Sequence, residues 1–239
     1  YLIIATGSFS QNIFDYNKEL FKNVPRVFYG TGVGLQITKN KFSSNINKKN
    51  LVYRTMNRGN ACGFHLVPTD YGYYFGATNH ISSFKEDLAR VKSLKILTEG
   101  IVEQFNIKFE EHNLNYMVGH RPTTADAFPL LGPLKKNNKI IIATGNKRNG
   151  LTCSLEIADL IKNYINGDKH SFDSYKVFTP ERKLISYFDQ ETAIKNTAES
   201  LASGTFMHSK HPNNIDMKKE IAIETNKLRQ IYKKLKIKN

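Results

Sequence analysis

The sequence predicts a mixed α/β (α+β) fold, and three features support this prediction. The pentapeptide Ile-Ile-Ala-Thr-Gly occurs twice, at residues 3–7 and 141–145, each time closing a short apolar run. The second copy is followed by a Gly-containing turn and by residues 151–165, in which apolar residues recur at three- and four-residue steps. Residues 27–81 contain short β-branched or aromatic segments separated by Gly, Asn, Pro and Asp. Together these features indicate parallel strands, a helix and an antiparallel sheet.

The two copies of the pentapeptide predict two buried strands of one parallel sheet, each ending where a ligand binds. Residues 140–143 are wholly apolar, which is typical of a short strand buried on both faces. The free N–H groups at the start of the following helix favour an anionic or electron-rich ligand near the strand ends. We expect this helix to stop at Asn166 and Gly167. Its expected apolar face consists of Leu151, Leu155, Ala158, Ile161 and Ile165.

Residues 119–133 are predicted to form an extended loop that carries Arg121. Arg121 and Arg148 are expected to flank the crevice above the strand ends. The spacing leaves a second interpretation open, in which this is an ordinary α/β domain and both arginines are surface residues. Spacing alone does not identify the ligand.

The residue types are more specific than their spacing. From His120 to Gly132 the chain reads His-Arg-Pro-x-Thr-x-Asp-x-x-Pro-x-x-Gly, and Asn-x-x-Asn-Gly-Leu-Thr follows the second Ala-Thr-Gly. This pattern resembles the C-terminal part of the D-amino-acid-oxidase-like flavoproteins, and it is most similar to their glycine oxidase and sarcosine oxidase-like branch. The resemblance implies part of an FAD/NAD(P)-binding Rossmann-like domain plus an antiparallel-sheet substrate domain.

The resemblance also implies roles for individual residues. Arg121 becomes the clamp for the substrate carboxylate, and His65 and Arg148 join it as candidate catalytic residues. His65 stands where the glycine oxidase branch carries a substrate-facing tyrosine, which leaves the substrate open. Gly119 occupies the place of the cysteine that holds FAD covalently in some members, so noncovalent FAD is expected. The residues expected beside the cofactor are Ala5, Gly7, Gly145, Asn146, Arg148, Asn149, Gly150, Leu151 and Thr152.

The dinucleotide fingerprint G-x-G-x-x-G at a strand-to-helix turn does not occur in this sequence. In the nearest segment, residues 30–35, the third glycine is one position early and strand-like alternation follows, so we predict a strand with close backbone packing. The adenine- and pyrophosphate-binding lobe is therefore expected upstream of Tyr1. The expected domains are 1–25 as the end of the FAD-binding domain, 26–118 as a substrate-binding antiparallel sheet with covering helices, 119–182 as the return to the FAD-binding domain, and 183–239 as a basic C-terminal extension.

The remaining elements are assigned from local patterns. Residues 84–109 are predicted to be helical, with one apolar face and a break near Gly100. Residues 216–238 combine helical spacing of apolar residues with many lysines, which indicates a surface or partner helix. A hairpin is predicted with its turn at Thr69 and Asp70. The strands expected before residue 81 are 27–29, 34–38, 51–55, 62–67 and 71–77.

Composition limits the classes of partner. The net charge is +14, but the lysines occur in runs with Asn and Ile, so we do not expect a nucleic-acid partner. No apolar run reaches the length of a membrane span, and two cysteines fit a reducing compartment, so a cytoplasmic protein is expected. His208 and His211 have no third ligand nearby in sequence, so no metal site is expected. A homo-oligomer is left open.

The implied reaction is the oxidation of a small amino acid or related carboxylated amine. The α-hydrogen leaves as hydride to the flavin, the imine product hydrolyses, and oxygen or another electron acceptor reoxidises the flavin. Two alternatives are a flavoprotein that acts on a modified tRNA base and an inactive fragment or scaffold without the FAD lobe. In a third, another polypeptide supplies that lobe.

Overall fold

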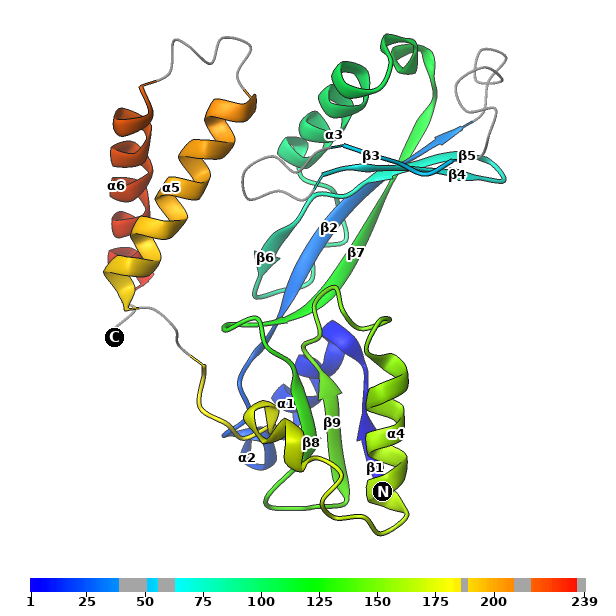
Figure 1. The fold of residues 1–239 in the computed structure, drawn as a ribbon, viewed down its shortest axis with the longest axis vertical. Coiled ribbons are helices and arrows are strands. Elements are labelled where there is room, and N and C mark those ends of the chain that lie inside the picture. The colour runs from blue at the N-terminus through cyan, green and yellow to red at the C-terminus, as the bar shows by residue number, and fades with distance from the viewer. Residues whose placement is uncertain (39–50, 56–62, 186–188, 209–215, 236–239) are drawn as a thin grey trace. The chain divides into compact units, whose positions relative to one another are not determined.

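The computed structural model describes residues 1–38, 51–55, 63–185, 189–208 and 216–235 (Figure 1). These residues divide into two compact units, each described here by itself. Unit 1 contains Tyr1–Val33, Asn79–Arg90 and Met117–Ile185. Unit 2 contains Gly34–Thr78, Val91–Tyr116 and Ser186–Asn239.

The elements of unit 1 are β1 (Leu2–Ile4), η1 (Gly7–Phe9), α1 (Ser10–Tyr16), α2 (Lys18–Phe21), β6 (His80–Ser82), β8 (Leu130–Pro133), β9 (Ile140–Thr144), α4 (Ser154–Ile165) and η4 (Asp173–Phe178). Those of unit 2 are β3 (Tyr53–Arg54), β4 (His65–Thr69), β5 (Gly72–Gly76), α3 (Val91–Gln104), η3 (Ile107–Glu111), α5 (Gln190–His208) and α6 (Met217–Leu235). Two long strands, β2 (Val27–Thr38) and β7 (Leu114–Thr124), contribute residues to both units.

A three-stranded sheet of order β1-β9-β8 organises unit 1 (Figure 1). β1 is parallel to β9 with Ile3 opposite Ile141, so the two copies of the pentapeptide lie side by side in register. β8 is antiparallel to β9 on its other side. The predicted pair of parallel strands is therefore confirmed.

The two parallel strands differ in burial. In β9, Ile140 and Ile142 belong to one buried apolar cluster and Ile141 to another, which confirms the predicted burial on both faces. In β1, Leu2 is 55% exposed and Ile3 is 44% exposed, so the prediction of a second buried strand was wrong. The reason is position, because β1 lies at an edge of the sheet and β9 at its centre.

α4 follows β9 and packs on the sheet through a face that shares only Ile161 with the predicted one. It starts at Ser154 and not at Leu151, and Leu151 and Leu155 are largely exposed. Its buried residues are Leu160, Ile161 and Tyr164. The helix has two apolar stripes, and periodicity alone did not distinguish the stripe that packs from the one that does not.

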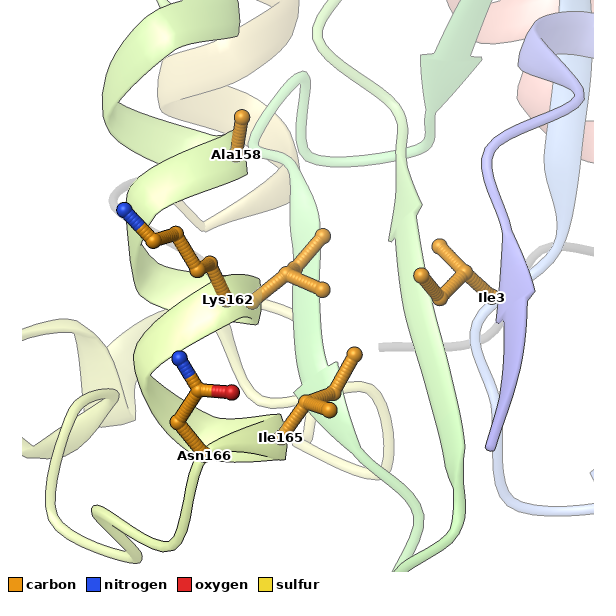
Figure 2. A pocket seen from close by; sticks show the side chains of 6 residues that line it. Ile3, Ala158, Lys162, Ile165 and Asn166 are labelled. Atoms are coloured by element: carbon orange, nitrogen blue, oxygen red, sulfur yellow. The ribbon is translucent and has the colours of Figure 1, made fainter.

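An open groove of about 420 Å³ is lined by residues of β1 and of the C-terminal half of α4 (Figure 2). Four of its six lining side chains are apolar, and the two polar ones come from Lys162 of α4 and from Asn166, which follows the helix. The lining residues are Ile3 from β1 and Ala158, Ile161, Lys162, Ile165 and Asn166 from the end of α4 or just after it.

In unit 1, β6 pairs with β2 in antiparallel register, with Gly30 opposite Ile81, and β7 also pairs with β2. A Cβ on Gly30 would lie only 2.8 Å from the Thr123 hydroxyl and 3.0 Å from the Arg121 carbonyl oxygen, so glycine permits this close approach. The predicted strand with close backbone packing is confirmed. The predicted extended loop around Arg121 was wrong, because these residues pair as part of β7.

In unit 2, β3, β4, β5 and β2 form an antiparallel sheet. β4 and β5 form the predicted hairpin, with Thr69 opposite Gly72. Of the predicted strand 62–67, Cys62 lies outside the described residues. α5 packs against α6, and Glu191 and Arg229 form an ion pair at 2.6 Å. α6 agrees with the helix predicted near the C-terminus.

The helical prediction for residues 84–109 needed two corrections. Residues 84–90 are not helical, and α3 begins at Val91 and continues through Gly100 without a break. A Cβ on Gly100 would lie 2.8 Å from the Phe64 ring. This glycine therefore allows the helix to pack closely against the Phe64 side chain and does not end the helix.

Candidate functional site

The parallel strands of unit 1 both lead into glycines with a left-handed backbone. The φ angle is 60° at Gly7 and 80° at Gly145. The Thr144 hydroxyl donates a hydrogen bond of 2.8 Å to the Gly7 carbonyl oxygen, which ties the two strand ends together. A Cβ on Gly7 would meet no atom within 4 Å, so there is open space beside this backbone. Ala5 precedes Gly7 and is exposed.

The segment after β9, residues 145–152, is connected to the strand that carries Arg121. The amide of Lys147 donates to the carbonyl oxygen of Pro122 over 2.9 Å. Lys147 has a φ of 49°, which is uncommon for a residue other than glycine. Sequence reasoning missed the role of this backbone, because the lysine side chain gives no signal for it. Within the segment, Asn146 and Gly150 are half-buried, whereas Arg148, Asn149, Leu151 and Thr152 are exposed.

The start of α4 offers backbone donors. Cys153, which precedes the helix, makes no side-chain capping hydrogen bond. Within the part of the chain that the structure describes, the amides of Gly150, Leu151 and Thr152 donate to no backbone carbonyl. Unpaired amides and the positive end of the helix dipole favour an electron-rich or anionic group at this place.

Arg121 lies on β7 and is half-buried. One of its terminal nitrogens, Nη1, donates to Oδ1 of Asn79 over 3.3 Å. This contact limits the orientations open to the guanidinium group. Asn79 was missed from the sequence because it lies 42 residues from Arg121 and outside the motif.

His120, next to Arg121, is held from two sides. Its Nδ1 lies 3.2 Å from the Thr31 hydroxyl, and its Nε2 lies 3.7 Å from Oδ1 of Asp87. Hydrogen bonds from Lys85, with a smaller contribution from His120, hold the pKa of Asp87 below its usual value. The His120 side chain is only 7% exposed. It therefore helps to hold β7 in place and does not extend into solvent as a binding group.

Asp126 and Arg182 form an ion pair beneath the site. Their side chains are 3% and 6% exposed. Burial alone would raise the pKa of Asp126, but hydrogen bonds from Arg182, from the amides of Ile185 and Phe128 and from Thr124 lower this pKa to about 2. The carboxylate is therefore charged at neutral pH. Asp126 was part of the recognised motif, but nothing in the sequence indicated its partner 56 residues away.

His65, the remaining predicted site residue, belongs to unit 2. It lies on β4, opposite Arg54 of β3 and Gly76 of β5, and is half-buried. Arg121, Arg148 and the residues expected beside the cofactor all belong to unit 1. The structure thus brings together all of the predicted site residues except His65 in one unit.

Among the described residues, no helix combines the length and the apolar character that a membrane span needs. They contain no group of three or more His, Cys, Asp or Glu side chains arranged to hold a metal ion, and His211 lies outside them. Cys153 is a free, half-buried thiol.

Comparison with solved structures shows the same fold in several oxidases. Glycine oxidase from Bacillus cereus has a TM-score of 0.52 and 18% identity, and the match covers 77% of this chain and 46% of that protein. Iminodiacetate oxidase from Chelativorans sp. BNC1 has a TM-score of 0.57 and 17% identity, with 74% and 45% covered. Glycine oxidase from Geobacillus kaustophilus has a TM-score of 0.57 and 17% identity, with 77% and 45% covered. This chain thus spans less than half the length of each of these proteins.

A search of curated proteins found no significant match. The family model described as DAO, FAD dependent oxidoreductase, matches residues 1–163, which include β1, β9, the start of α4 and the strand that carries Arg121. On that match the chain belongs to the DAO family of FAD-dependent oxidoreductases.

Proposed function

We propose that this chain is part of an enzyme that oxidises a small amino acid or related carboxylated amine with noncovalently bound FAD. The observation that carries the proposal is the hydrogen bond from the Lys147 amide to the Pro122 carbonyl oxygen. It joins the strand of Arg121 to the segment expected beside the flavin. A carboxylate-binding side chain and a cofactor-binding backbone thus belong to one compact unit.

The residues at the strand ends fit a bound flavin. Open space lies beside the left-handed Gly7, and the amides of Gly150, Leu151 and Thr152 are available as donors. Exposed Leu151 offers an apolar surface for a flat ring. Gly119 is exposed and has no thiol to bond to a cofactor. The residues proposed to hold the flavin are Ala5, Gly7, Gly145, Asn146, Arg148, Asn149, Gly150, Leu151 and Thr152.

FAD would supply the hydride acceptor, and this chain would place the substrate. Arg121 binds the substrate carboxylate by a charge-assisted pair, and Asn79 orients the guanidinium group. Fixing the carboxylate holds the α-carbon in one position. The entropy cost of orienting the substrate therefore falls on the binding step and not on the chemical step. The amides before α4 stabilise negative charge that develops near them. Hydride transfer requires no side-chain base, so none is assigned.

Two further residues receive proposed roles. His65 stands where the glycine oxidase branch carries a substrate-facing tyrosine, and we keep it as a candidate catalytic residue. Arg148 adds positive charge beside the segment of residues 145–152. The low number of cysteines suits a reducing compartment, and we place the enzyme in the cytoplasm, with oxygen or another acceptor reoxidising the flavin.

The test uses the full-length protein and its absorbance spectrum. Purified protein should carry an oxidised flavin, and anaerobic glycine, sarcosine or a D-amino acid should bleach its visible band. Arg121→Ala should retain the flavin but lower kcat/KM by roughly 10- to 100-fold, because a hydrogen bond to a charged group is lost. His112→Gln, in unit 2 and buried against the Lys108 carbonyl, serves as a variant outside the proposed site.

Three outcomes would contradict the proposal. Purified protein that contains no flavin would leave only the alternative in which the chain is an inactive fragment or scaffold. A bound flavin that no amine reduces, but that responds to tRNA, would favour action on a modified tRNA base. Bleaching that is unchanged in Arg121→Ala would leave the reaction in place but remove Arg121 as the carboxylate clamp.

A further inference from the structure

The turn between β7 and β8, residues 124–129, is built around the carboxylate of Asp126. The Thr124 hydroxyl and the Phe128 amide donate to Oδ1 over 2.9 and 3.1 Å. The Ile185 amide donates to Oδ2 over 2.9 Å. The Ala127 amide closes the turn by donating to the Thr124 carbonyl oxygen over 3.1 Å. The Thr124 hydroxyl also lies 2.6 Å from the Phe128 carbonyl oxygen, so the turn is held both by the buried carboxylate and by Thr124.

The turn contains a strained residue. Ala127 has a φ of 62°, in the left-handed region that disfavours every residue with a Cβ. Ala127 is also exposed, so packing of its side chain does not hold this conformation. The hydrogen bonds that Asp126 and Thr124 make with the backbone of the turn hold it instead.

Arg182 completes the turn from a distant segment, residues 178–185, which we call the strap. Its guanidinium pairs with both oxygens of Asp126, and its Nη2 also donates to the carbonyl oxygens of Phe128 and Pro129 over 3.2 and 3.4 Å. One residue earlier in the strap, Glu181 accepts a hydrogen bond from the amide of Lys135, which lies two residues after β8. Replacing a buried ion pair with apolar residues is often neutral or stabilising, so stability alone does not account for this pair.

The turn contacts the segment proposed to lie beside the flavin. A Cβ on Gly145 would lie 3.2 Å from Cγ2 of Thr124 and 3.3 Å from Cα of Pro129. The next contact is the Lys147 amide on the carbonyl oxygen of Pro122, the residue after Arg121. A change in the path of the turn would therefore shift Gly145 and the residues after it relative to Arg121.

We propose that Asp126 and Arg182 are a positioning pair for the substrate and cofactor site. The pair fixes the backbone of residues 124–129, and through it the distance between Arg121 and residues 145–152. This inference rests on the proposed function. It assigns a role in the site to a segment that lies beyond the family match at residues 1–163.

The test compares the full-length protein with two variants and a control. Arg182→Lys keeps the charge but loses the planar fork that contacts Asp126 and two carbonyl groups at once. The double variant Asp126→Leu/Arg182→Met replaces the pair with apolar side chains of similar size. The control, Lys22→Met, removes the exposed ion pair with Glu19 in the same unit.

The first readout needs neither substrate nor flavin. Hydrogen exchange of the Lys147 amide should accelerate at least tenfold in both variants and remain unchanged in Lys22→Met. The thermal midpoint of the double variant should fall, because the amides of Phe128 and Ile185 lose their acceptor. Faster exchange of the Lys147 amide in Arg182→Lys, measured at temperatures where this variant remains fully folded, would separate positioning from stability.

The second readout uses the loaded enzyme. Both variants should lower kcat/KM at least tenfold, mainly through KM, and should weaken flavin binding. A double variant with wild-type exchange and wild-type kcat/KM would overturn the proposal, as would an Arg182→Lys variant that matches the wild type in both. If the wild type binds no flavin, the proposed function fails, and the exchange of Lys147 still decides whether the pair positions these residues.

Discussion

The two copies of Ile-Ile-Ala-Thr-Gly place one sequence in two environments of the same sheet (Figure 1). Both form a parallel strand and both end in a glycine with positive φ. Ile141 is fully buried at the centre of the sheet, whereas its partner Ile3 is 44% exposed at the edge. Five identical residues therefore determine the local backbone, while the neighbouring strands determine burial. The same substitution made at equivalent positions of the two copies therefore compares one change in two environments.

The largest effect is expected at the isoleucine pair. Ile141→Ala removes a fully buried side chain and should lower the free energy of unfolding by about 2–5 kcal/mol. Ile3→Ala removes a half-exposed side chain and should cost less than about 1 kcal/mol. Urea unfolding at pH 7 measures both. Equal losses would mean that β1 is as buried in solution as β9.

The next effect is expected at low pH and concerns the edge of the sheet that β8 forms. Asp126 supports the β8 edge with a pKa of about 2, below the value of about 3.9 expected in the unfolded chain. Its contribution of about 2–3 kcal/mol is therefore complete above about pH 5 and is lost progressively as the pH falls from about 5 toward 1. The difference in unfolding free energy between wild type and Asp126→Asn should shrink over this range. A difference that stays constant from pH 6 to pH 2 would contradict it.

The glycine pair should give a smaller difference. Gly145→Ala adds a Cβ at positive φ within 3.2–3.4 Å of its neighbours and should cost about 1–3 kcal/mol. Gly7→Ala has the same backbone problem but no nearby atoms, and should cost about 1 kcal/mol. If flavin lies beside Gly7, Gly7→Ala should weaken flavin binding at least tenfold despite this small cost. Flavin titration and thermal unfolding of the same samples measure both effects.

The threonine pair should give the smallest effect. Thr144→Val removes the hydrogen bond to the Gly7 carbonyl and should cost about 1 kcal/mol. The exposed Thr6 contacts the Ser10 hydroxyl at 3.0 Å, and Thr6→Val should cost less than about 0.5 kcal/mol. A larger loss for Thr6→Val would show that the end of β1 depends on its own contacts and not on β9.

Local patterns predicted the hairpin of β4 and β5 from its turn at Thr69 and Asp70, and the repeated pentapeptide predicted the pairing of β1 with β9, which lie far apart in sequence. Gly100 was misread as a helix break because a glycine that permits close packing looks the same in sequence as one that ends a helix. The buried face of α4 was predicted correctly only at Ile161, because apolar residues occur on more than one side of this helix.

The candidate site was predictable only where a motif carried it. The motif placed Arg121 and residues 145–152, and both belong to unit 1. Asn79 and Arg182 contact this motif from 42 and 56 residues away. Such pairings depend on the path of the whole chain, and no periodicity or turn residue indicates them.

The separation of Asp126 and Arg182 also affects the order of folding. Arg182 is added 56 positions after Asp126, so the strand that carries the motif, the turn and the segment after β9 are all synthesised before Arg182 exists. The strained turn at Ala127 therefore cannot reach its native path until Arg182 has been synthesised, and the proposed substrate site cannot be completed before then.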